Sequence, residues 1–175
     1  ANSLFEDNAE YGYGMYIGVK KIREQLLEVA KKAVETASGE LKEALEQWIE
    51  FANLGAATRQ RSARLVAAIE AEGATTPELK EILEKKQFLI KRSHWIFGGD
   101  GWAYDIGFGG VDHVLASGED INIWVFDTEV YSNTGGQSSK STHEAAVAQF
   151  AASGKRTKKK DLGMMAMSYG YVYVA

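Results

Sequence analysis

The sequence predicts an α/β fold in which a parallel sheet carries an inserted helical segment. Apolar residues recur at three- and four-residue steps through residues 19–92, a spacing typical of amphipathic helices. Two short apolar runs follow, at residues 94–97 and 121–126, with room for one helix between them. Strand, helix and strand at this spacing favour a right-handed parallel crossover. At 175 residues, 45% of them apolar and 25% charged, the chain is long enough and apolar enough to bury a core.

The first half of the chain is expected to be mostly helical. Residues 2–19 are rich in Gly, Asn and Tyr, and residues 8–15 are expected to form a loop that leads into a helix. Gly39 and Gly55 are plausible breaks between helices, and Thr76-Pro77-Glu78 is typical of a helix start. The spacing indicates three or four helices whose charges form a solvated face. The apolar positions that set it are Ile22, Leu26, Val29, Ala33 and Ala37, then Leu41, Leu45, Trp48, Ile49 and Ala52.

The second half is expected to alternate strands and helices. The crossover helix should cover residues 104–117, between the two apolar runs. A polar loop at residues 132–139 precedes an Ala-rich helix at 144–152 and a basic loop at 155–160. A last helix at 161–169 should lead into a strand at Tyr171.

Composition excludes several classes of protein. The net charge of −4 argues against a nucleic-acid-binding role. The chain has no cysteine, so it forms no disulfide and supplies no thiolate to an iron–sulfur cluster. No apolar run approaches the roughly 20 residues of a membrane span, and the N-terminus lacks a signal-peptide layout. We therefore expect a cytoplasmic protein without a membrane partner. The missing initiator Met and the strand-like C-terminal end favour a fragment of a longer chain.

Two segments that follow the apolar runs carry ligands for a metal ion. Gly99-Asp100-Gly101 follows the first run, and Thr128 lies 28 positions after Asp100, about the length of one βαβ unit. In such sheets ligands bind beyond the carboxyl ends of the strands. A carboxylate, a hydroxyl and a backbone carbonyl would give three oxygen ligands, and two diphosphate oxygens and a water would complete octahedral Mg²⁺. By itself Gly-Asp-Gly can also be a plain turn.

A polar loop of small residues follows the proposed ligands directly, with the sequence Tyr131-Ser132-Asn133-Thr134-Gly135-Gly136-Gln137. It can wrap closely around a cofactor, and taken alone it can equally be an exposed loop.

These strings resemble a known enzyme family. Gly-Asp-Gly followed by a polar ligand pair resembles the diphosphate-binding motif of thiamine-dependent enzymes. Longer strings are similar to pyruvate:ferredoxin (flavodoxin) oxidoreductase, and the resemblance covers nearly the whole chain. They lie at residues 2–10, 99–107, 127–137 and 154–173.

The resemblance implies roles for individual residues. Residues 1–175 would form part of a thiamine diphosphate-binding domain, with residues 19–92 as a helical segment within it. Asp100 and the Thr128 side chain would ligate magnesium, and Val130 would do so through its carbonyl oxygen. Gly99 and Gly101 would lie against the diphosphate. Asn133 would be the catalytic residue, reaching the reactive end of the cofactor and the bound 2-oxoacid.

The resemblance also implies a reaction and its partners. The family converts pyruvate and coenzyme A to acetyl-CoA and carbon dioxide, and passes electrons through 4Fe-4S clusters to ferredoxin or flavodoxin. The cluster cysteines, and the Glu that activates the aminopyrimidine, would lie in the remaining domains of a homodimeric enzyme. The isolated chain would then be inactive. The alternatives are an oxidoreductase for another 2-oxoacid and a non-catalytic segment that serves assembly.

Other residues have less specific interpretations. Where the family pattern has Pro, this chain has His143, which we expect to start a helix and assign no role. His94 and His113 are expected to be structural, and Met164, Met165 and Met167 to belong to a core. The basic residues from Lys155 to Lys160 either form a solvated loop or attract coenzyme A phosphates or an acidic ferredoxin.

Overall fold

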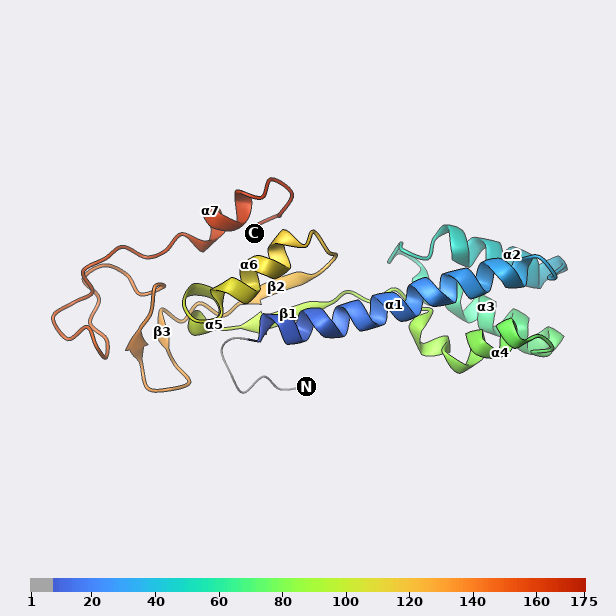
Figure 1. Ribbon diagram of the computed structural model, residues 1–175, viewed down its shortest axis with the longest axis horizontal. Coiled ribbons are helices and arrows are strands. Elements are labelled where there is room, and N and C mark those ends of the chain that lie inside the picture. The colour runs from blue at the N-terminus through green and yellow to red at the C-terminus, as the bar shows by residue number, and fades with distance from the viewer. Residues whose placement is uncertain (1–7) are drawn as a thin grey trace. The chain divides into compact units, whose positions relative to one another are not determined.

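The computed structural model describes residues 8–175, which form two compact units (Figure 1). The first unit contains the described residues up to Tyr16 together with His94–Ala175, and the second contains Ile17–Ser93. Helix α1 (Ala9–Val34) begins in the first unit and continues into the second. Most of the resemblance at residues 2–10 lies outside the described residues.

The second unit is helical. After α1 come α2 (Gly39–Glu50), α3 (Thr58–Glu72), α4 (Pro77–Glu84) and the 3₁₀ helix η1 (Lys86–Phe88). Thr76 caps α4 by accepting a hydrogen bond from the Leu79 amide at 3.3 Å. Large side chains from all four helices share one buried cluster, in which the Trp48 indole donates to the Leu89 carbonyl at 3.1 Å. The cluster includes Leu26, Leu41, Leu45, Leu65, Ile69 and Ile82.

The loop expected at residues 8–15 is wrong, because α1 already begins at Ala9. The glycines in this stretch suggest a loop, but at least one of them has a packing role. A Cβ on Gly12 would lie 2.9 Å from Ile96, so this position lets the helix approach the strand that carries Ile96.

The first unit contains the predicted parallel crossover. Strands β1 (Trp95–Gly98) and β2 (Asn122–Val125) pair in parallel, with Gly98 opposite Val125. Two short helices, α5 (Asp100–Tyr104) and α6 (Phe108–Ala116), replace the single helix expected at residues 104–117. They cover one face of the sheet with a buried cluster that includes Ile96, Trp102, Ala103, Tyr104, Val111 and Val114. The α/β class is therefore confirmed.

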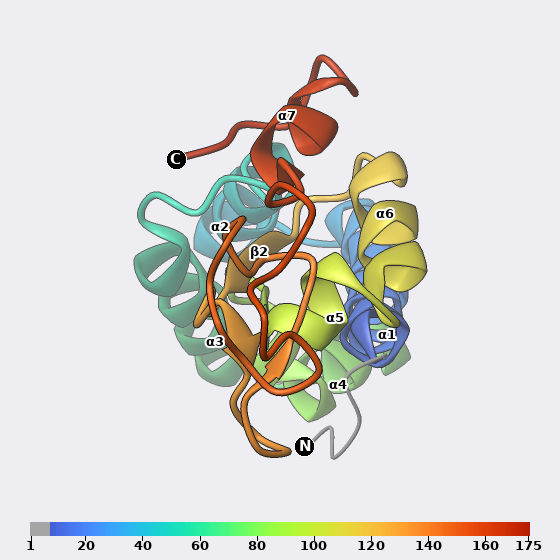
Figure 2. The ribbon, with the colours of Figure 1, turned by 90° about the vertical axis from the view of Figure 1, so that its left-hand side faces the viewer.

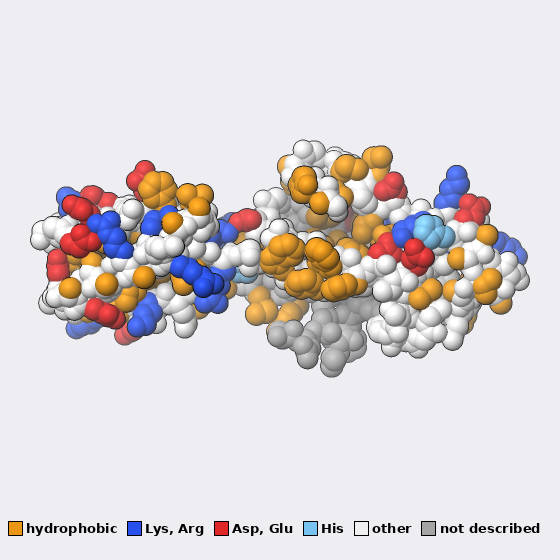
Figure 3. Space-filling view, turned by 180° about the vertical axis from the view of Figure 1, so that it is seen from behind, with side chains coloured by type: hydrophobic (Ala, Val, Ile, Leu, Met, Phe, Trp, Pro, Cys, Tyr) orange, Lys and Arg blue, Asp and Glu red, His pale blue; other side chains and the backbone are white. Residues whose placement is uncertain are grey.

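The opposite face of the two strands carries four exposed aromatic side chains. Trp95 stacks on Phe97 with ring centroids 6.2 Å apart, and Phe97 stacks on Phe126 at 6.1 Å. Trp124 lies beside Trp95 and Phe126. About half of each side chain is exposed, and apolar side chains gather over the middle of the view from behind (Figure 3).

A short hairpin occupies most of the loop expected at residues 132–139. Strands β3 (Val130–Tyr131) and β4 (Gln137–Ser138) pair antiparallel, and the hairpin lies next to α5 (Figures 1 and 2). Gly135 and Gly136 have φ values of 142° and 82°, a conformation that glycine adopts without steric cost. The turn that contains Asn133 thus depends on these two glycines.

The helix expected at residues 144–152 is wrong. Ala145 and Phe150 have φ values of 67° and 65°, which interrupt any right-handed helix. The segment instead bonds to its neighbours: the Gln149 amide donates to the Gly136 carbonyl at 3.0 Å, and the Ala145 amide to the Lys155 carbonyl at 2.8 Å. Tertiary hydrogen bonds have overridden the helical propensity of an Ala-rich stretch.

The C-terminal expectations hold only in part. Helix α7 (Leu162–Met167) forms within the expected range of 161–169. Its methionines are not core residues, because Met164, Met165 and Met167 are 60%, 42% and 48% exposed. The strand expected at Tyr171 does not form either: the Tyr171 hydroxyl donates to the Ala116 carbonyl at 2.9 Å, and no ladder pairs this segment. In residues 8–175 no helix is long and apolar enough to cross a membrane.

The helical unit should depend on its buried leucines. Leu45 is fully buried, so Leu45→Ala should lower the free energy of unfolding by about 2–5 kcal/mol. Leu54 is 50% exposed, so the matched Leu54→Ala should cost much less. Urea denaturation followed by circular dichroism measures both. Equal losses for the two variants would contradict this description of the core.

Candidate functional site

The site lies where β1 and β2 end. Gly99 follows β1 and is the N-cap of α5, and Asp100 is the first residue of that helix. Phe126 donates its amide to the Gly98 carbonyl at 2.7 Å, which extends the strand pairing by one residue. Asp127 and Thr128 follow directly. Parallel strands end at the same edge of the sheet, so the two segments meet there.

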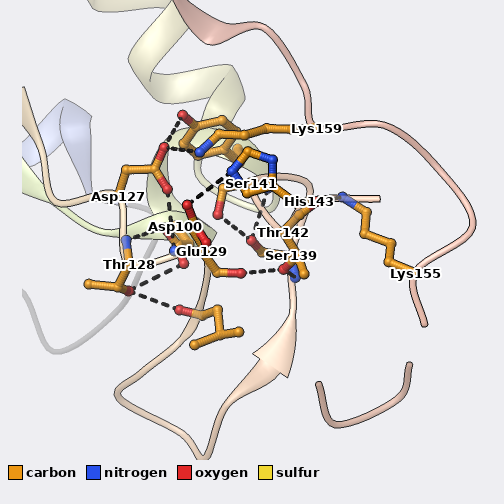
Figure 4. A network of polar contacts seen from close by, with 12 residues as sticks. Asp100, Asp127, Thr128, Glu129, Ser139, Ser141, Thr142, His143, Lys155 and Lys159 are labelled. Atoms are coloured by element: carbon orange, nitrogen blue, oxygen red, sulfur yellow. Dashed lines mark hydrogen bonds and ion pairs between the residues drawn. The ribbon is translucent and has the colours of Figure 1, made fainter. Parts of the chain in front are cut away.

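Asp100 and Thr128 are in contact. The Thr128 amide donates to Oδ1 of Asp100 at 3.2 Å, and the Thr128 hydroxyl lies 3.3 Å from Oδ2. The same hydroxyl lies 3.0 Å from the Val130 carbonyl oxygen and 2.9 Å from the Ser132 hydroxyl (Figure 4). The sequence predicted that the first two residues would meet, and the structure adds the position of the Val130 carbonyl.

These oxygens are spaced like neighbouring ligands of one small cation. In octahedral Mg²⁺ coordination at about 2.1 Å, adjacent ligand oxygens are about 3.0 Å apart. The separations of 3.3 Å and 3.0 Å from the Thr128 hydroxyl to Asp100 and Val130 are close to that value. In the part of the chain that the structure describes, no group of three or more His, Cys, Asp or Glu side chains could hold a metal. An ion at this site would therefore need further oxygens from a ligand.

The Asp100 carboxyl group is buried, with 3% of the residue exposed. Burial raises the pKa of Asp100, and the nearby charge of Asp127 raises it further. Hydrogen bonds from Ser141 and Thr128 favour the ionised form and oppose these effects in part. The result is a carboxylate that a cation would stabilise more than water does.

Neighbouring Asp127 has three hydrogen-bond partners. The Glu129 amide donates to Oδ1 of Asp127 at 3.3 Å. The Tyr104 hydroxyl donates to its Oδ2 at 2.7 Å, and the Lys159 ammonium binds the same oxygen at 2.5 Å. Burial raises the pKa of Asp127, but the hydrogen bonds from Lys159, Tyr104 and the Glu129 amide, together with the charge of Lys159, outweigh it and hold the pKa below its ordinary value. Burial and the bond to Asp127 together raise the pKa of the Tyr104 hydroxyl. Asp127 is thus a structural anion, whereas Asp100 has only hydroxyl and amide donors.

The glycines on either side of Asp100 do not form a plain turn, because both belong to the start of α5. Gly99 has φ −105°, which any residue can adopt, and a Cβ there would meet nothing nearer than the Phe126 carbonyl at 3.9 Å. Neither backbone conformation nor internal packing requires glycine at this position. A bulky anion that approaches the backbone would require it.

Comparison with known proteins decides the family. The family model described as "Thiamine pyrophosphate enzyme, C-terminal TPP binding domain" matches residues 85–175, which contain β1, β2 and the whole candidate site. The chain belongs to this thiamine pyrophosphate-binding family.

Relatives match along the whole chain. A pyruvate-flavodoxin oxidoreductase from Klebsiella pneumoniae is 60% identical over 176 residues, and a pyruvate:ferredoxin oxidoreductase from Moorella thermoacetica is 55% identical over 181. A mitochondrial pyruvate dehydrogenase [NADP(+)] from Euglena gracilis is 51% identical over 176 residues. The matches cover 99–100% of this chain and 15%, 16% and 10% of the three relatives. The chain therefore corresponds to a short segment of much longer enzymes.

Asn133, assigned to the reactive end of the bound cofactor, lies at the exposed turn of the β3–β4 hairpin in this thiamine pyrophosphate-binding domain. The hairpin begins at Val130, the third proposed metal ligand. The structure brings Asp100, Thr128 and Val130 together, and the turn that carries Asn133 follows them.

Sequence reasoning missed the buried hydroxyls of Ser139, Ser141 and Thr142, which are 5%, 0% and 1% exposed. The only available signal was the run Ser138-Ser139-Lys140-Ser141-Thr142, which a loop explains equally well. His143 does not start a helix: its Nε2 lies 3.0 Å from Oε1 of Glu129, and both side chains are more than half exposed.

The basic loop is not a free cationic patch. Lys155 donates to the Thr142 carbonyl at 2.5 Å, and Lys160 donates to the Tyr104 carbonyl at 3.2 Å and lies 3.1 Å from the Phe108 ring centroid. With Lys159 bound to Asp127, three of the cations serve contacts within the thiamine pyrophosphate-binding domain. Arg156 and Lys158 remain exposed.

The Asp127 ion pair predicts a pH-dependent contribution to stability. A carboxyl whose pKa is lowered by folding stabilises the protein above its unfolded pKa, and the stabilisation is lost as the pH falls through the folded pKa. Asp127→Asn should therefore lower the free energy of unfolding by about 1 kcal/mol at pH 7. The difference in the free energy of unfolding between the parent and Asp127→Asn should shrink as the pH falls below the ordinary Asp pKa of 3.8.

Denaturant unfolding at several pH values measures this difference. Lys159→Met removes the same contact from the other side, and its loss at pH 7 should be similar. A penalty for Asp127→Asn that stays constant down to the acid end of the range would contradict the assignment.

Proposed function

We propose that this chain forms the Mg²⁺–thiamine diphosphate site of a pyruvate:ferredoxin (flavodoxin) oxidoreductase. The observation that carries the proposal is the convergence of the Asp100 carboxylate, the Thr128 hydroxyl and the Val130 carbonyl at the ends of two parallel strands. The family match, which includes these residues, supports the same cofactor.

In this proposal three protein oxygens, from Asp100, Thr128 and Val130, hold the magnesium ion. Two oxygens of the cofactor diphosphate and one water complete the octahedron. Gly99 and Gly101 keep side chains away from the path of the diphosphate. The geometry fits, because the protein supplies hard oxygen ligands at the right spacing and too few of them to hold the ion alone.

Bound thiamine diphosphate supplies the nucleophilic carbon and the electron sink that decarboxylation of a 2-oxoacid needs. The protein's part is binding and orientation. Asp100, Thr128 and Val130 fix the diphosphate end. Asn133, on the hairpin that continues from Val130, would donate a side-chain hydrogen bond at the reactive end, where the 2-oxoacid binds.

The whole enzyme would convert pyruvate and coenzyme A to acetyl-CoA and carbon dioxide in the cytoplasm. Electrons would pass through 4Fe-4S clusters to ferredoxin or flavodoxin. The chain has no cysteine, so the cluster ligands would come from the remaining domains of a homodimer, and the isolated segment would be inactive. The names of the Klebsiella and Moorella relatives support this reaction class.

A second candidate is an oxidoreductase with a different acceptor or 2-oxoacid. The Euglena relative, named as an NADP(+)-dependent pyruvate dehydrogenase, supports a different acceptor. Comparison of pyruvate with longer 2-oxoacids, and of ferredoxin with flavodoxin and NADP⁺, in the intact enzyme distinguishes these candidates. A third candidate is a non-catalytic segment that serves assembly. For such a segment, calorimetry should detect no heat of binding when Mg²⁺ and thiamine diphosphate are added together to the protein.

The proposed metal site predicts the effect of changing Asp100. In the intact enzyme Asp100→Ala should abolish magnesium-dependent binding of thiamine diphosphate, because it removes the one charged ligand that the protein supplies in the proposed site. Isothermal titration calorimetry measures the binding. Asp112→Ala on α6 is the matched control, since this carboxylate binds the Tyr169 hydroxyl and should not affect the cofactor. Ordinary affinity in Asp100→Ala would refute the proposed site.

The role assigned to Asn133 predicts a different pattern. Asn133→Ala should leave the affinity for Mg²⁺ and thiamine diphosphate within about threefold, because Asn133 is not a metal ligand in the proposal. It should slow pyruvate-dependent electron transfer by about 100-fold or more, the scale of one lost transition-state donor. Steady-state kinetics with saturating cofactor measure the rate. Unchanged turnover would remove Asn133 from the reactive end.

A further inference from the structure

The segment from Ser139 to Thr142 buries three hydroxyl groups at the edge of the site. A hydroxyl buried without a hydrogen bond destabilises a fold, so a fold retains such groups when they have partners. Here they bond to one another: the Ser139 and Ser141 hydroxyls are 2.7 Å apart, and the Ser139 amide donates to the Thr142 hydroxyl at 2.9 Å. The Ser141 amide donates to the Ser139 hydroxyl at 3.0 Å. The segment is therefore a compact turn whose hydroxyl groups are held by hydrogen bonds within it.

The first outgoing contact reaches Asp100. Interaction with the Ser141 side chain favours the ionised form of this carboxyl group and opposes the rise in the pKa of Asp100. Thr128 contacts the same carboxylate through its amide and its hydroxyl (Figure 4).

The second outgoing hydrogen bond reaches the other arm of the site. The Thr142 hydroxyl donates to the backbone carbonyl of Glu129. Glu129 lies between Thr128 and Val130 and has φ 66°, a left-handed conformation that is strained for a residue other than glycine. In this conformation the Val130 carbonyl oxygen lies 3.0 Å from the Thr128 hydroxyl. The Thr142 bond holds the peptide that connects the two proposed ligands.

The ion pair between Glu129 and His143 contributes less. Both side chains are more than half exposed, and such an exposed pair contributes little to stability. The Thr142 hydroxyl is 1% exposed and bonds the backbone itself, so it is the stronger constraint on the strained residue.

From these contacts we propose that Ser141 and Thr142 are positioning residues for the metal site, one for each arm. Ser141 orients the Asp100 carboxylate, and Thr142 maintains the left-handed turn that presents the Val130 carbonyl. The inference rests on the proposed function, because it needs Asp100 and Val130 to be ligands. Magnesium demands near-ideal octahedral geometry, so small displacements of either arm should weaken its binding.

The test measures how much Mg²⁺ half-saturates thiamine diphosphate binding in the intact enzyme. Ser141→Ala and Thr142→Val should each raise that concentration about 10- to 100-fold, the usual effect of removing a partner of a metal ligand. Thr142→Ser keeps the hydroxyl and should stay within about threefold of the parent. The control is Ser62→Ala on α3, because Ser62 is equally buried and its hydroxyl has no partner among the described residues.

A purely structural role gives a different result. If the role is purely structural, Ser141→Ala and Thr142→Val lower the melting temperature of the cofactor-free protein and leave the Mg²⁺ requirement unchanged. That result would overturn the inference. Should either variant fail to fold, Ser139→Ala removes only the hydroxyl that holds Ser141. That variant should raise the Mg²⁺ requirement several-fold, and an unchanged requirement would again overturn the inference.

Asp100→Asn separates this inference from the proposed function. If Asp100→Asn loses cofactor binding while Ser141→Ala and Thr142→Val bind as the parent does, the proposed function stands and the positioning role fails. If Asp100→Asn binds as the parent does, the metal site itself is wrong, and the positioning role fails with it.

Discussion

The site depends on one constraint, the parallel register of β1 and β2. Gly98 lies opposite Val125, and the next amide, that of Phe126, still bonds to the Gly98 carbonyl. That register places Asp100, two positions after Gly98, beside Thr128, two positions after Phe126. Asp100 and Thr128 therefore meet where the paired strands end, and their hydrogen bonds join the two segments. A slip of one residue would separate them and turn the aromatic side chains to the other face of the sheet.

Two aspartates of the site, 27 positions apart in sequence, have different partners, and their pKa values shift in opposite directions. Asp127 has Lys159 and Tyr104 and stabilises the folded protein. Asp100 has hydroxyl and amide donors only, and its pKa is raised. An ionised carboxyl with a raised pKa costs stability at neutral pH, and such a cost is typical of functional sites. Binding of a divalent cation beside Asp100 would turn this cost in stability into a gain, because the cation favours the ionised form of the carboxyl group.

The sequence predicted the features that depend on local pattern. The amphipathic helices, the parallel crossover and the meeting of Asp100 with Thr128 follow from spacing and topology. The failures lie where tertiary contacts override propensity. The Ala-rich stretch at 144–152 contains left-handed residues and bonds to the hairpin, and the segment at Tyr171 bonds to the end of α6. Ser141 and Thr142 could not be recognised, because their proposed role depends on burial and on single tertiary contacts that no sequence pattern specifies.

The most direct test of the central claim is a crystal structure of the intact enzyme with thiamine diphosphate and Mn²⁺ in place of Mg²⁺. Anomalous scattering locates the manganese independently of the protein atoms. The account predicts one peak between the diphosphate and the protein, about 2.0–2.3 Å from a carboxylate oxygen of Asp100, the hydroxyl of Thr128 and the carbonyl oxygen of Val130. A cofactor-bound metal ion that does not touch Asp100 or Thr128 would contradict it.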